Sequence, residues 1–503
     1  MDKTTESAST SAKTEKEGVQ IKGKDIVYLN APEVRLSKDT PLLTDAQDLA
    51  GAINELFSYG EGGGEDYVKP WKRPSDWPVL PAPNDNQVIF LVTTALNPSP
   101  YCSVGTRPLD QYAFPENNGS YPEDLTINID WGDGNTSTGV YRTARTMKWT
   151  NSHARIGPNA NNPVIETTAG NYYYEHTDDI YGGKSYWNSG GTKLDDGSMV
   201  FIVTITVSNP QNVVIESPAN SYALEMHIGR NININKNQIN ISQKLLQHVK
   251  AFGWQPGNNK DKQYSLYNSN TGTIYWNTNG IFSYNNNLRK IDATEPFTEI
   301  PDRMCSYIYG TVEIDLSEVI KIGDGAFQCT ASPASTLELP KCTEIGAEAF
   351  KQFSGLVSLN APALTTVGNK AFLYGYGIRE ISAQNLETIS AEAFNDCYTL
   401  VRADVPSLKI IVTRGFNNCY ALKDINAPSL EAVGDYAFGY CYSLDQLIAP
   451  NLSSAGSNAF IYCLSLKKLV YAKGIDLSKA GLDSSYLWYD NPELKDRHPT
   501  NIT

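Results

Sequence analysis

Seven phenylalanines recur through the C-terminal half of the chain at a nearly constant interval of about 22 residues, which is within the range of repeat architectures. They are Phe327, Phe350, Phe372, Phe394, Phe416, Phe438 and Phe460. A leucine or isoleucine follows each of the last six after a constant interval, at Leu356, Ile378, Leu400, Leu422, Leu444 and Leu466. A hydrophobic pattern with one fixed period predicts a solenoid, in which each period forms one coil and successive coils stack.

The pattern within one period is clearest between Leu422 and Leu444, where it is L-x-x-I-x-A-P-x-L-x-x-V-G-x-x-A-F-x-x-C-Y-x-L. This is a variant of the leucine-rich repeat, with one short strand and one tight helical or irregular return in each coil. A single coil cannot bury enough apolar surface to offset the conformational entropy that it loses on folding. The coils must therefore stack and share their apolar faces.

Two further columns carry side chains with more chemistry. A cysteine follows four of the phenylalanines, at Cys397, Cys419, Cys441 and Cys463, and stacked sulfurs in adjacent strands can in geometry bridge or bind a metal. Zinc sites need paired ligands within one loop, so the pattern favours buried free thiols. The next column is Tyr376, Tyr398, Tyr420 and Tyr442. These tyrosines are predicted either to contact a sugar or protein ligand or to form a structural aromatic ladder.

The outward positions of the predicted strands vary from coil to coil. One column is Glu380, Arg402, Asp424, Gln446 and Lys468, and the column beside it is Arg379, Val401, Lys423, Asp445 and Lys467. Opposite charges on successive strands pair across a sheet and help to fix its register. The face is therefore either a solvated surface with salt bridges or a binding surface. If it binds a ligand, the candidate residues are the four tyrosines together with Arg402, Asp424, Gln446 and Lys468.

The N-terminal region, residues 1–64, is predicted to be an attachment arm followed by a short helix. Residues 1–18 are polar, and a capping box at Thr44–Gln47 begins a helix that extends to about residue 59. Leu49, Ile53 and Leu56 form one apolar stripe on it. The stripe either packs on the next domain or associates with copies of itself, and the glycine-rich stretch that follows favours a homo-oligomer, with a trimer preferred.

A β domain is predicted for residues 65–215. Apolar strands are expected at 87–96, 125–131 and 199–207, and Asp133–Gly134 supplies a tight turn between them. This order indicates a small β-sandwich. Residues 216–288 are interpreted as a connector with an irregular first coil, residues 289–474 as the repeats, and residues 475–503 as a polar cap for the open end of the solenoid. The expected fold class is mainly β.

Composition narrows the range of partners. The formal net charge is −14 and the pI is near 4.9, which argues against nucleic acid because its phosphates would be repelled. No apolar run approaches the ~20 residues needed to cross a bilayer. The N-terminus lacks the apolar core of a secretory signal peptide, so the protein is expected to be made in a cytosol and kept there, or released by lysis.

Motifs for catalysis or cofactor binding are absent from the sequence. The five histidines do not have metal-ligand spacings, and there is no nucleophile elbow, phosphate-binding loop or dinucleotide-binding glycine pattern. Asp130, Asp133 and Asn135 offer oxygens to calcium, but their spacing favours a turn without metal. We therefore expect neither an enzyme nor a bound cofactor or metal.

Three segments carry a resemblance to known families. "IDWGDGNTSTG", "YYYEHTDDIYGG" and "FIVTITV" resemble a polycystic-kidney-disease (PKD) repeat, which implies an immunoglobulin-like sandwich. The C-terminal periods are similar to BspA-type leucine-rich repeats. "RPSDWPVLP" before these modules, together with "LLTDAQDLAGAINELF", resembles tail-fibre and other virion proteins of tailed bacteriophages.

The resemblance implies a phage virion protein, a fibre or appendage whose repeats adhere to a host-surface glycan or protein. Its N-terminal region would contact other virion proteins, and it would lie exposed on the particle. The alternatives are an architectural decoration protein without host binding, a bacterial BspA-like surface adhesin, and an enzyme that acts on envelope sugars.

Overall fold

The structure is a computed structural model. It describes residues 71–93, 103–108, 125–134, 136–141, 154–156, 172–175, 190–208, 210, 213–216, 223–232, 234–235, 245–256, 265–268, 273–276, 280–332 and 334–482. The predicted arm and helix, including Leu49, Ile53 and Leu56, lie outside these ranges. No helix within them is long and apolar enough to cross a membrane.

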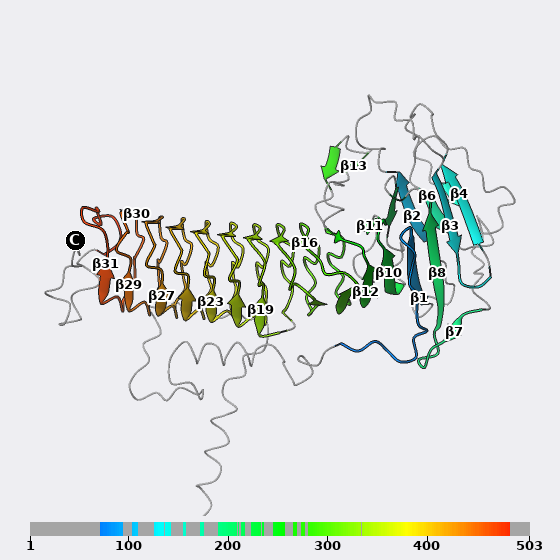
Figure 1. The fold of residues 1–503 in the computed structure, drawn as a ribbon, viewed down its shortest axis with the longest axis horizontal. Coiled ribbons are helices and arrows are strands. Elements are labelled where there is room, and N and C mark those ends of the chain that lie inside the picture. The colour runs from blue at the N-terminus through cyan, green and yellow to red at the C-terminus, as the bar shows by residue number, and fades with distance from the viewer. Residues whose placement is uncertain are drawn as a thin grey trace, which may run out of the picture.

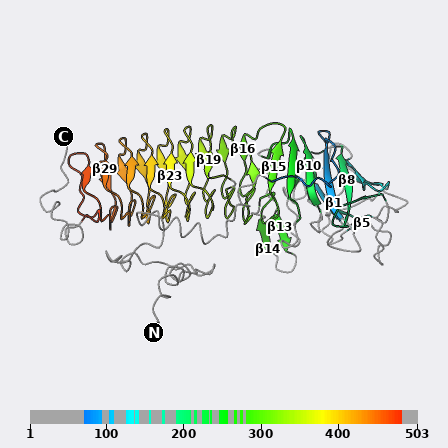
Figure 2. The same cartoon turned by 90° about the horizontal axis from the view of Figure 1, so that it is seen from below.

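The C-terminal half is a solenoid of stacked coils, each with a strand on two of its sides (Figure 1, Figure 2). The front sheet consists of parallel strands β19 (Thr336–Glu338), β21 (Ser358–Asn360), β23 (Glu380–Ser382), β25 (Arg402–Asp404) and β27 (Asp424–Asn426), followed by the pair β29 (Gln446–Ile448) and β31 (Lys468–Val470). The back sheet consists of β16 (Glu299–Ile300), β18 (Lys321–Ile322), β20 (Glu344–Ile345), β22 (Thr366–Val367), β24 (Thr388–Ile389), β26 (Ile410–Ile411), β28 (Ala432–Val433) and β30 (Ser454–Ala455). The return of each coil is thus an irregular path that contains a second strand.

The predicted apolar columns form the core. From Phe350 to Phe460 the phenylalanine rings are almost fully buried. Neighbouring rings stack along the whole series from Phe327, with centroids 5.0 to 5.7 Å apart. The leucine column that follows is buried as well. Because successive coils from Phe327 to Phe460 offer the same ring at the same height, each inner ring packs against one in the coil before and one in the coil after, which links these coils into one core.

Between residues 303 and 462, two residues in each coil bend the backbone through the left-handed region. In one coil they are Glu392 with φ 58° and Asp396 with φ 60°, and in the next they are Arg414 and Asn418. This conformation costs a residue other than glycine roughly 1–2 kcal/mol. Backbone hydrogen bonds between coils offset the cost: Asp396 N–H donates to the Asn417 carbonyl at 3.0 Å. The turns are therefore stable only within a stack.

The N-terminal part and the solenoid share a sheet. Nine strands form it: β1 (Gln87–Thr93), β3 (Leu125–Asp130), β4 (Thr136–Tyr141), β7 (Thr192–Lys193), β8 (Met199–Val207), β10 (Ala223–Gly229), β12 (His248–Phe252), β15 (Lys290–Ala293) and β17 (Glu313–Ile314). Strand β10 pairs with β1 in antiparallel orientation and with β12 in parallel orientation. The parallel coils thus begin directly on the last strand of the antiparallel sheet, and Figure 1 shows the two parts end to end.

Further strands lie beside this sheet. Five of them form a second sheet: β2 (Ser103–Pro108), β5 (Ala154–Ile156), β6 (Tyr172–Glu175), β9 (Val213–Glu216) and β11 (Ile234–Asn235). Strands β13 (Ser265–Asn268) and β14 (Thr273–Trp276) form a hairpin. The strands predicted near 87–96, 125–131 and 199–207 are present as β1, β3 and β8. Assignment of these sheets to the PKD class stays a prediction.

Both faces of strand β1 are buried. Val88, Phe90 and Val92 belong to the large core that continues through the solenoid. Ile89 and Leu91 face the other way and pack in a smaller cluster with Trp77 and Leu80. The proline-rich segment around Trp77 therefore covers the outer face of the sheet.

The turn after β3 contains two of the three residues considered for calcium. The Asp130 carboxylate accepts a hydrogen bond from the Gly132 N–H at 2.9 Å, and Gly132 has φ 79°. This bond is the side-chain turn that the Asp-Trp-Gly sequence favours. Asn135 lies outside the described residues.

A buried ion network holds the Trp77 segment on the sheet. Arg73 Nη2 donates to Glu225 Oε2 at 2.6 Å, and the Glu225 side chain is 2% exposed. His248 Nδ1 lies 2.7 Å from Glu225 Oε1, and His248 Nε2 lies 3.0 Å from Asp292 Oδ2. Arg73 also donates to the carbonyls of Trp77 and Pro78. The network thus joins a peripheral segment to β10, β12 and β15.

The charge of Glu225 makes the stability of this junction depend on pH. Burial by itself raises the pKa of Glu225, but hydrogen bonds from His227, His248 and Arg73, with the Arg73 charge, outweigh it and lower the pKa well below 4.5. A carboxyl with a depressed folded-state pKa stabilises the fold above its unfolded value, and this contribution disappears as the pH falls. We expect the midpoint of thermal unfolding to decrease below about pH 4.5 in the intact chain, and to decrease less steeply in Glu225→Gln. Parallel pH curves for the two proteins would contradict this assignment.

The solenoid extends beyond the last strand, β31. Asn458 N–H donates to the Lys479 carbonyl, and Phe460 N–H donates to the Ala480 carbonyl. These bonds repeat the ones between Phe438 and Ala459 one coil earlier. Residues 479–480 thus form part of one more coil at the C-terminal end.

Candidate binding surface of the solenoid

The four predicted tyrosines form a ladder along one edge of the front sheet. Ring centroids are 5.3 Å apart for Tyr376 and Tyr398, 4.8 Å for Tyr398 and Tyr420, and 5.2 Å for Tyr420 and Tyr442. All four side chains are half-buried. Since each ring lies against the next, the faces cover one another, and the ladder offers edges and hydroxyl groups to a ligand.

The hydroxyl groups of Tyr398, Tyr420 and Tyr442 stay protonated at neutral pH. Burial raises the pKa of Tyr398 and of Tyr420, and it raises the pKa of Tyr442 to about 12. A protonated phenol both donates and accepts hydrogen bonds. The ladder is therefore a row of neutral polar groups, a chemistry that suits the hydroxyls of a glycan or the amides of a peptide. Within it, the Tyr398 hydroxyl bonds the Asp396 carboxylate.

Polar side chains beneath the ladder form a second repeating cluster. Asn418 Nδ2 donates to Asp396 Oδ1 at 2.7 Å, and Asn395 Nδ2 donates to Asp396 Oδ2 at 3.0 Å. Asn417 Nδ2 in turn donates to Asn395 Oδ1 at 2.9 Å. Burial raises the pKa of Asp396, although the hydrogen bond from Asn418 opposes this. These residues had one weak signal in the sequence, an Asn-Asp pair at 395–396 followed one period later by Asn-Asn at 417–418.

The front sheet places the predicted variable column at its surface. Arg402 lies between Glu380 and Asp424 in the register of the sheet. Glu380, Arg402, Asp424, Gln446 and Lys468 are all exposed. Within the second outward column, Lys467 Nζ lies 3.2 Å from Asp445 Oδ1 of the preceding coil and forms a salt bridge with it.

On the back side, by contrast, basic side chains pair with acidic ones from the neighbouring coil. Lys321 pairs with Glu344 at 2.7 Å, and Lys409 pairs with Glu387 at 3.0 Å. Within the described coils, Arg402 and Lys468 form no salt bridge. The front face thus combines uncommitted charges with the tyrosine edges, which makes it the better candidate for a binding surface.

The cysteine column lies in the core. The four thiols of this column are fully buried and free. Each donates to a phenylalanine carbonyl of the preceding coil, as Cys419 does to Phe394 at 3.1 Å. Burial raises the pKa of each thiol well above its usual value. The column therefore consists of protonated, unreactive thiols that serve as small core residues.

Among the histidines, His227 and His248 belong to the network around Glu225, and the other three lie outside the described residues. In the part of the chain that the structure describes, no group of three acidic, histidine or cysteine side chains is arranged to hold a metal ion.

Comparison with known families supports the repeat assignment. The model of the BspA type leucine-rich repeat region, in six copies, matches residues 273–379 and 365–481. The C-terminal half is therefore a BspA-type leucine-rich repeat region, as the sequence pattern indicates. A search of the curated proteins gives no match.

Several solved structures are similar to the chain at low identity. A leucine-rich cell surface protein from Faecalibacterium prausnitzii is 22% identical over 41% of this chain, with a TM-score of 0.29. A leucine-rich repeat protein from Eubacterium ventriosum is 16% identical over 51%, with a TM-score of 0.28. One from Bacteroides ovatus is 15% identical over 74% of this chain and 98% of its own length, with a TM-score of 0.24. The chain spans 52% and 63% of the length of the first two proteins.

Proposed function

We propose that this protein is an adhesin whose leucine-rich repeats bind a surface glycan or protein along the front sheet. The observation that carries the proposal is the combination, on one face, of a row of tyrosine hydroxyls and a column of exposed charges without salt bridges. The rungs repeat at a constant spacing, so an elongated ligand can make the same contact several times. Many weak contacts of this kind add up to firm adhesion.

We further propose that the adhesin is part of a bacteriophage particle. What supports this context is the resemblance of the N-terminal segments to phage fibre proteins, together with the apolar stripe Leu49, Ile53 and Leu56 for assembly into a trimer. Several copies on one particle would multiply the affinity of each solenoid. Immunogold labelling of particles from a lysate tests the context: labelled particles support it, whereas label confined to the bacterial surface favours the BspA-like adhesin.

Binding itself is tested with charge reversals on the two faces of the full-length protein. We expect Arg402→Glu with Lys468→Glu to reduce adhesion to bacterial cells or to their purified envelope polysaccharide by about tenfold or more, since like charges at an interface are unfavourable. Lys409→Glu on the back side is the matched control and should change adhesion little. Surface plasmon resonance on immobilised polysaccharide measures both.

Tyr420→Phe separates the hydroxyl group from the ring. The phenyl ring keeps the stacking, so the melting temperature should stay near that of the parent while adhesion falls. Adhesion that is lost equally in front and back variants would contradict the proposed face. Particle labelling without any adhesion would favour an architectural role.

A further inference from the structure

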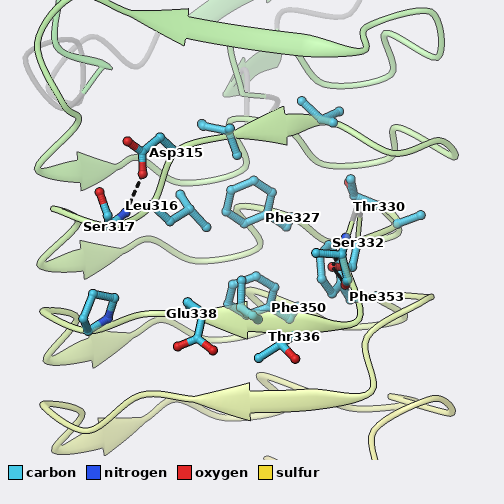
Figure 3. A pocket seen from close by; sticks show the side chains of 16 residues that line it. Asp315, Leu316, Ser317, Phe327, Thr330, Ser332, Thr336, Glu338, Phe350 and Phe353 are labelled. Carbon is cyan, nitrogen blue, oxygen red and sulfur yellow. Dashed lines mark hydrogen bonds between the residues drawn. The ribbon is translucent and has the colours of Figure 1, made fainter. Parts of the chain in front are cut away.

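The front of the solenoid is interrupted between β17 and β19. Strand β17 ends the nine-stranded sheet and β19 begins the front sheet, and no described strand pairs with the edges that face each other. The back sheet is continuous at this level, since β18 pairs with β20. A cavity of about 290 Å³ opens at the interruption (Figure 3). Its apolar lining consists of Leu316, Phe327, Leu337, Phe350 and Phe353, and its polar rim consists of Asp315, Ser317 and Thr336.

Around the cavity, the sequence of two coils departs from the leucine column, although Val312 of the first of them is buried and lines the cavity. Leu288 and Leu356 occupy that column on either side, and both are fully buried. Cys305 and Phe327 occupy the same position in successive coils. The Cys305 N–H donates to the Ala326 carbonyl, and the Phe327 N–H makes the equivalent bond to the Ala349 carbonyl one coil later. Six residues after them the sequence has Thr311 and Pro333 instead of leucine, and Pro333 lies outside the described residues. An apolar space without its side chain loses packing energy, so an occupant would be stabilising.

The chain contains an additional copy of the missing sequence. Residues 26–34, Ile-Val-Tyr-Leu-Asn-Ala-Pro-Glu-Val, align with residues 356–364, Leu-Val-Ser-Leu-Asn-Ala-Pro-Ala-Leu. Five of the nine positions are identical, namely Val27, Leu29, Asn30, Ala31 and Pro32. In the coil, Leu356 fills the leucine column and Ser358–Asn360 form β21. The residue that aligns with Leu356 is Ile26.

The N-terminal region enters the fold beside this cavity. The backbone N–H of Trp71 donates to the Glu313 carboxylate on β17 at 2.5 Å. Residues 35–70 lie between the nonapeptide and Trp71, and 36 residues span up to about 120 Å when extended. The segment can therefore reach the interruption from where the chain begins its described path.

We propose that residues 26–34 of the same molecule add to the free edge of β19 as a parallel strand and insert Ile26 into the cavity. On the occupied side of β19, Ser358–Asn360 of β21 pair with Thr336–Glu338. The alignment gives residues 28–30 the same register on the free side, so that Tyr28 lies opposite Thr336. Asn360 Nδ2 already donates to Glu338 Oε2 at 2.6 Å, and Asn30 presents the same amide from the opposite side. An added strand satisfies edge backbone groups that otherwise remain unpaired.

Disulfide trapping in the full-length protein tests the register. Tyr28→Cys with Thr336→Cys places two thiols at neighbouring-strand distance, within the range that a disulfide bridges. The control pair is Tyr28→Cys with Thr366→Cys, whose second site is on the back sheet. With diamide as oxidant, we expect at least about tenfold more intramolecular disulfide in the test pair than in the control, because docking raises the effective concentration of the two thiols. Peptide mapping by mass spectrometry identifies the linked pair.

Two further variants show whether the cavity drives docking. Ile26→Asp removes the apolar side chain that enters the cavity, and Ala334→Leu fills the cavity from its lining, so each should reduce the trapped fraction severalfold. The melting temperature of each variant confirms that it is folded. Equal trapping in the test and control pairs, or a disulfide that joins two different molecules, would overturn the proposal. The outcome is independent of what the front sheet binds.

Discussion

Phe416→Ala is expected to lower the free energy of unfolding of the solenoid by about 3–5 kcal/mol. Phe416 is fully buried in the middle of the ladder, with ring centroids of Phe394 at 5.5 Å and Phe438 at 5.7 Å. Removing its ring deprives both neighbours of their stacking partner and leaves a space that the rigid coils cannot close. The effect is large because every coil depends on its neighbours for stability.

Urea denaturation followed by far-ultraviolet circular dichroism measures this loss. Leu464→Ala is the matched control, since Leu464 belongs to the same coil series but is 50% exposed, and a surface change of this kind usually stays within about 0.5 kcal/mol. A loss for Phe416→Ala no greater than that of the control would mean that the phenylalanine ladder does not hold the coils together.

Glu225→Ala is expected to cost about 3–5 kcal/mol, because it leaves the partly buried positive charge of Arg73 without its partner. It also removes the acceptor of His248, which links β12 to β10. Because Arg73 holds the segment that carries Trp77, this segment should become accessible to protease before the coils do. Urea denaturation gives the free energy, and limited proteolysis with mass spectrometry locates the first cut.

The exposed ion pair between Arg230 and Glu295 provides the comparison for this prediction. Glu295→Ala removes the same chemical group from solvent-exposed surface, where water replaces the lost partner, so its effect should be far smaller. Equal losses for Glu225→Ala and Glu295→Ala would contradict a special role for the buried network.

The position of the tyrosine column was predictable, but the way its rings are used was not. The fixed period of the sequence places Tyr376, Tyr398 and Tyr420 one above another in any stacked repeat. Whether the rings lie face to face depends on side-chain rotamers and on the polar cluster around Asp396 beneath them. Both are set by neighbouring coils, so they appear only when the coils are stacked.

The junction network was still harder to predict. Glu225 interrupts an apolar strand, and this was its one signal in the sequence, but its partner Arg73 lies 152 residues away. The sheet that unites β1, β10 and β12 likewise depends on pairing between distant segments. Sequence patterns report which face of a strand is apolar, whereas they do not report which strand lies beside it.

By itself the sequence determined that the C-terminal half is a solenoid with phenylalanine and leucine columns inside and variable polar columns outside. A fixed period is a local property, because each coil repeats the same inward and outward positions along the chain. Only the tertiary structure decided that the coils begin on the last strand of the N-terminal sheet, that charges pair on the back but not throughout the front, and that a cavity opens at β19. These features depend on contacts between residues far apart in sequence, whose energies no periodic pattern records.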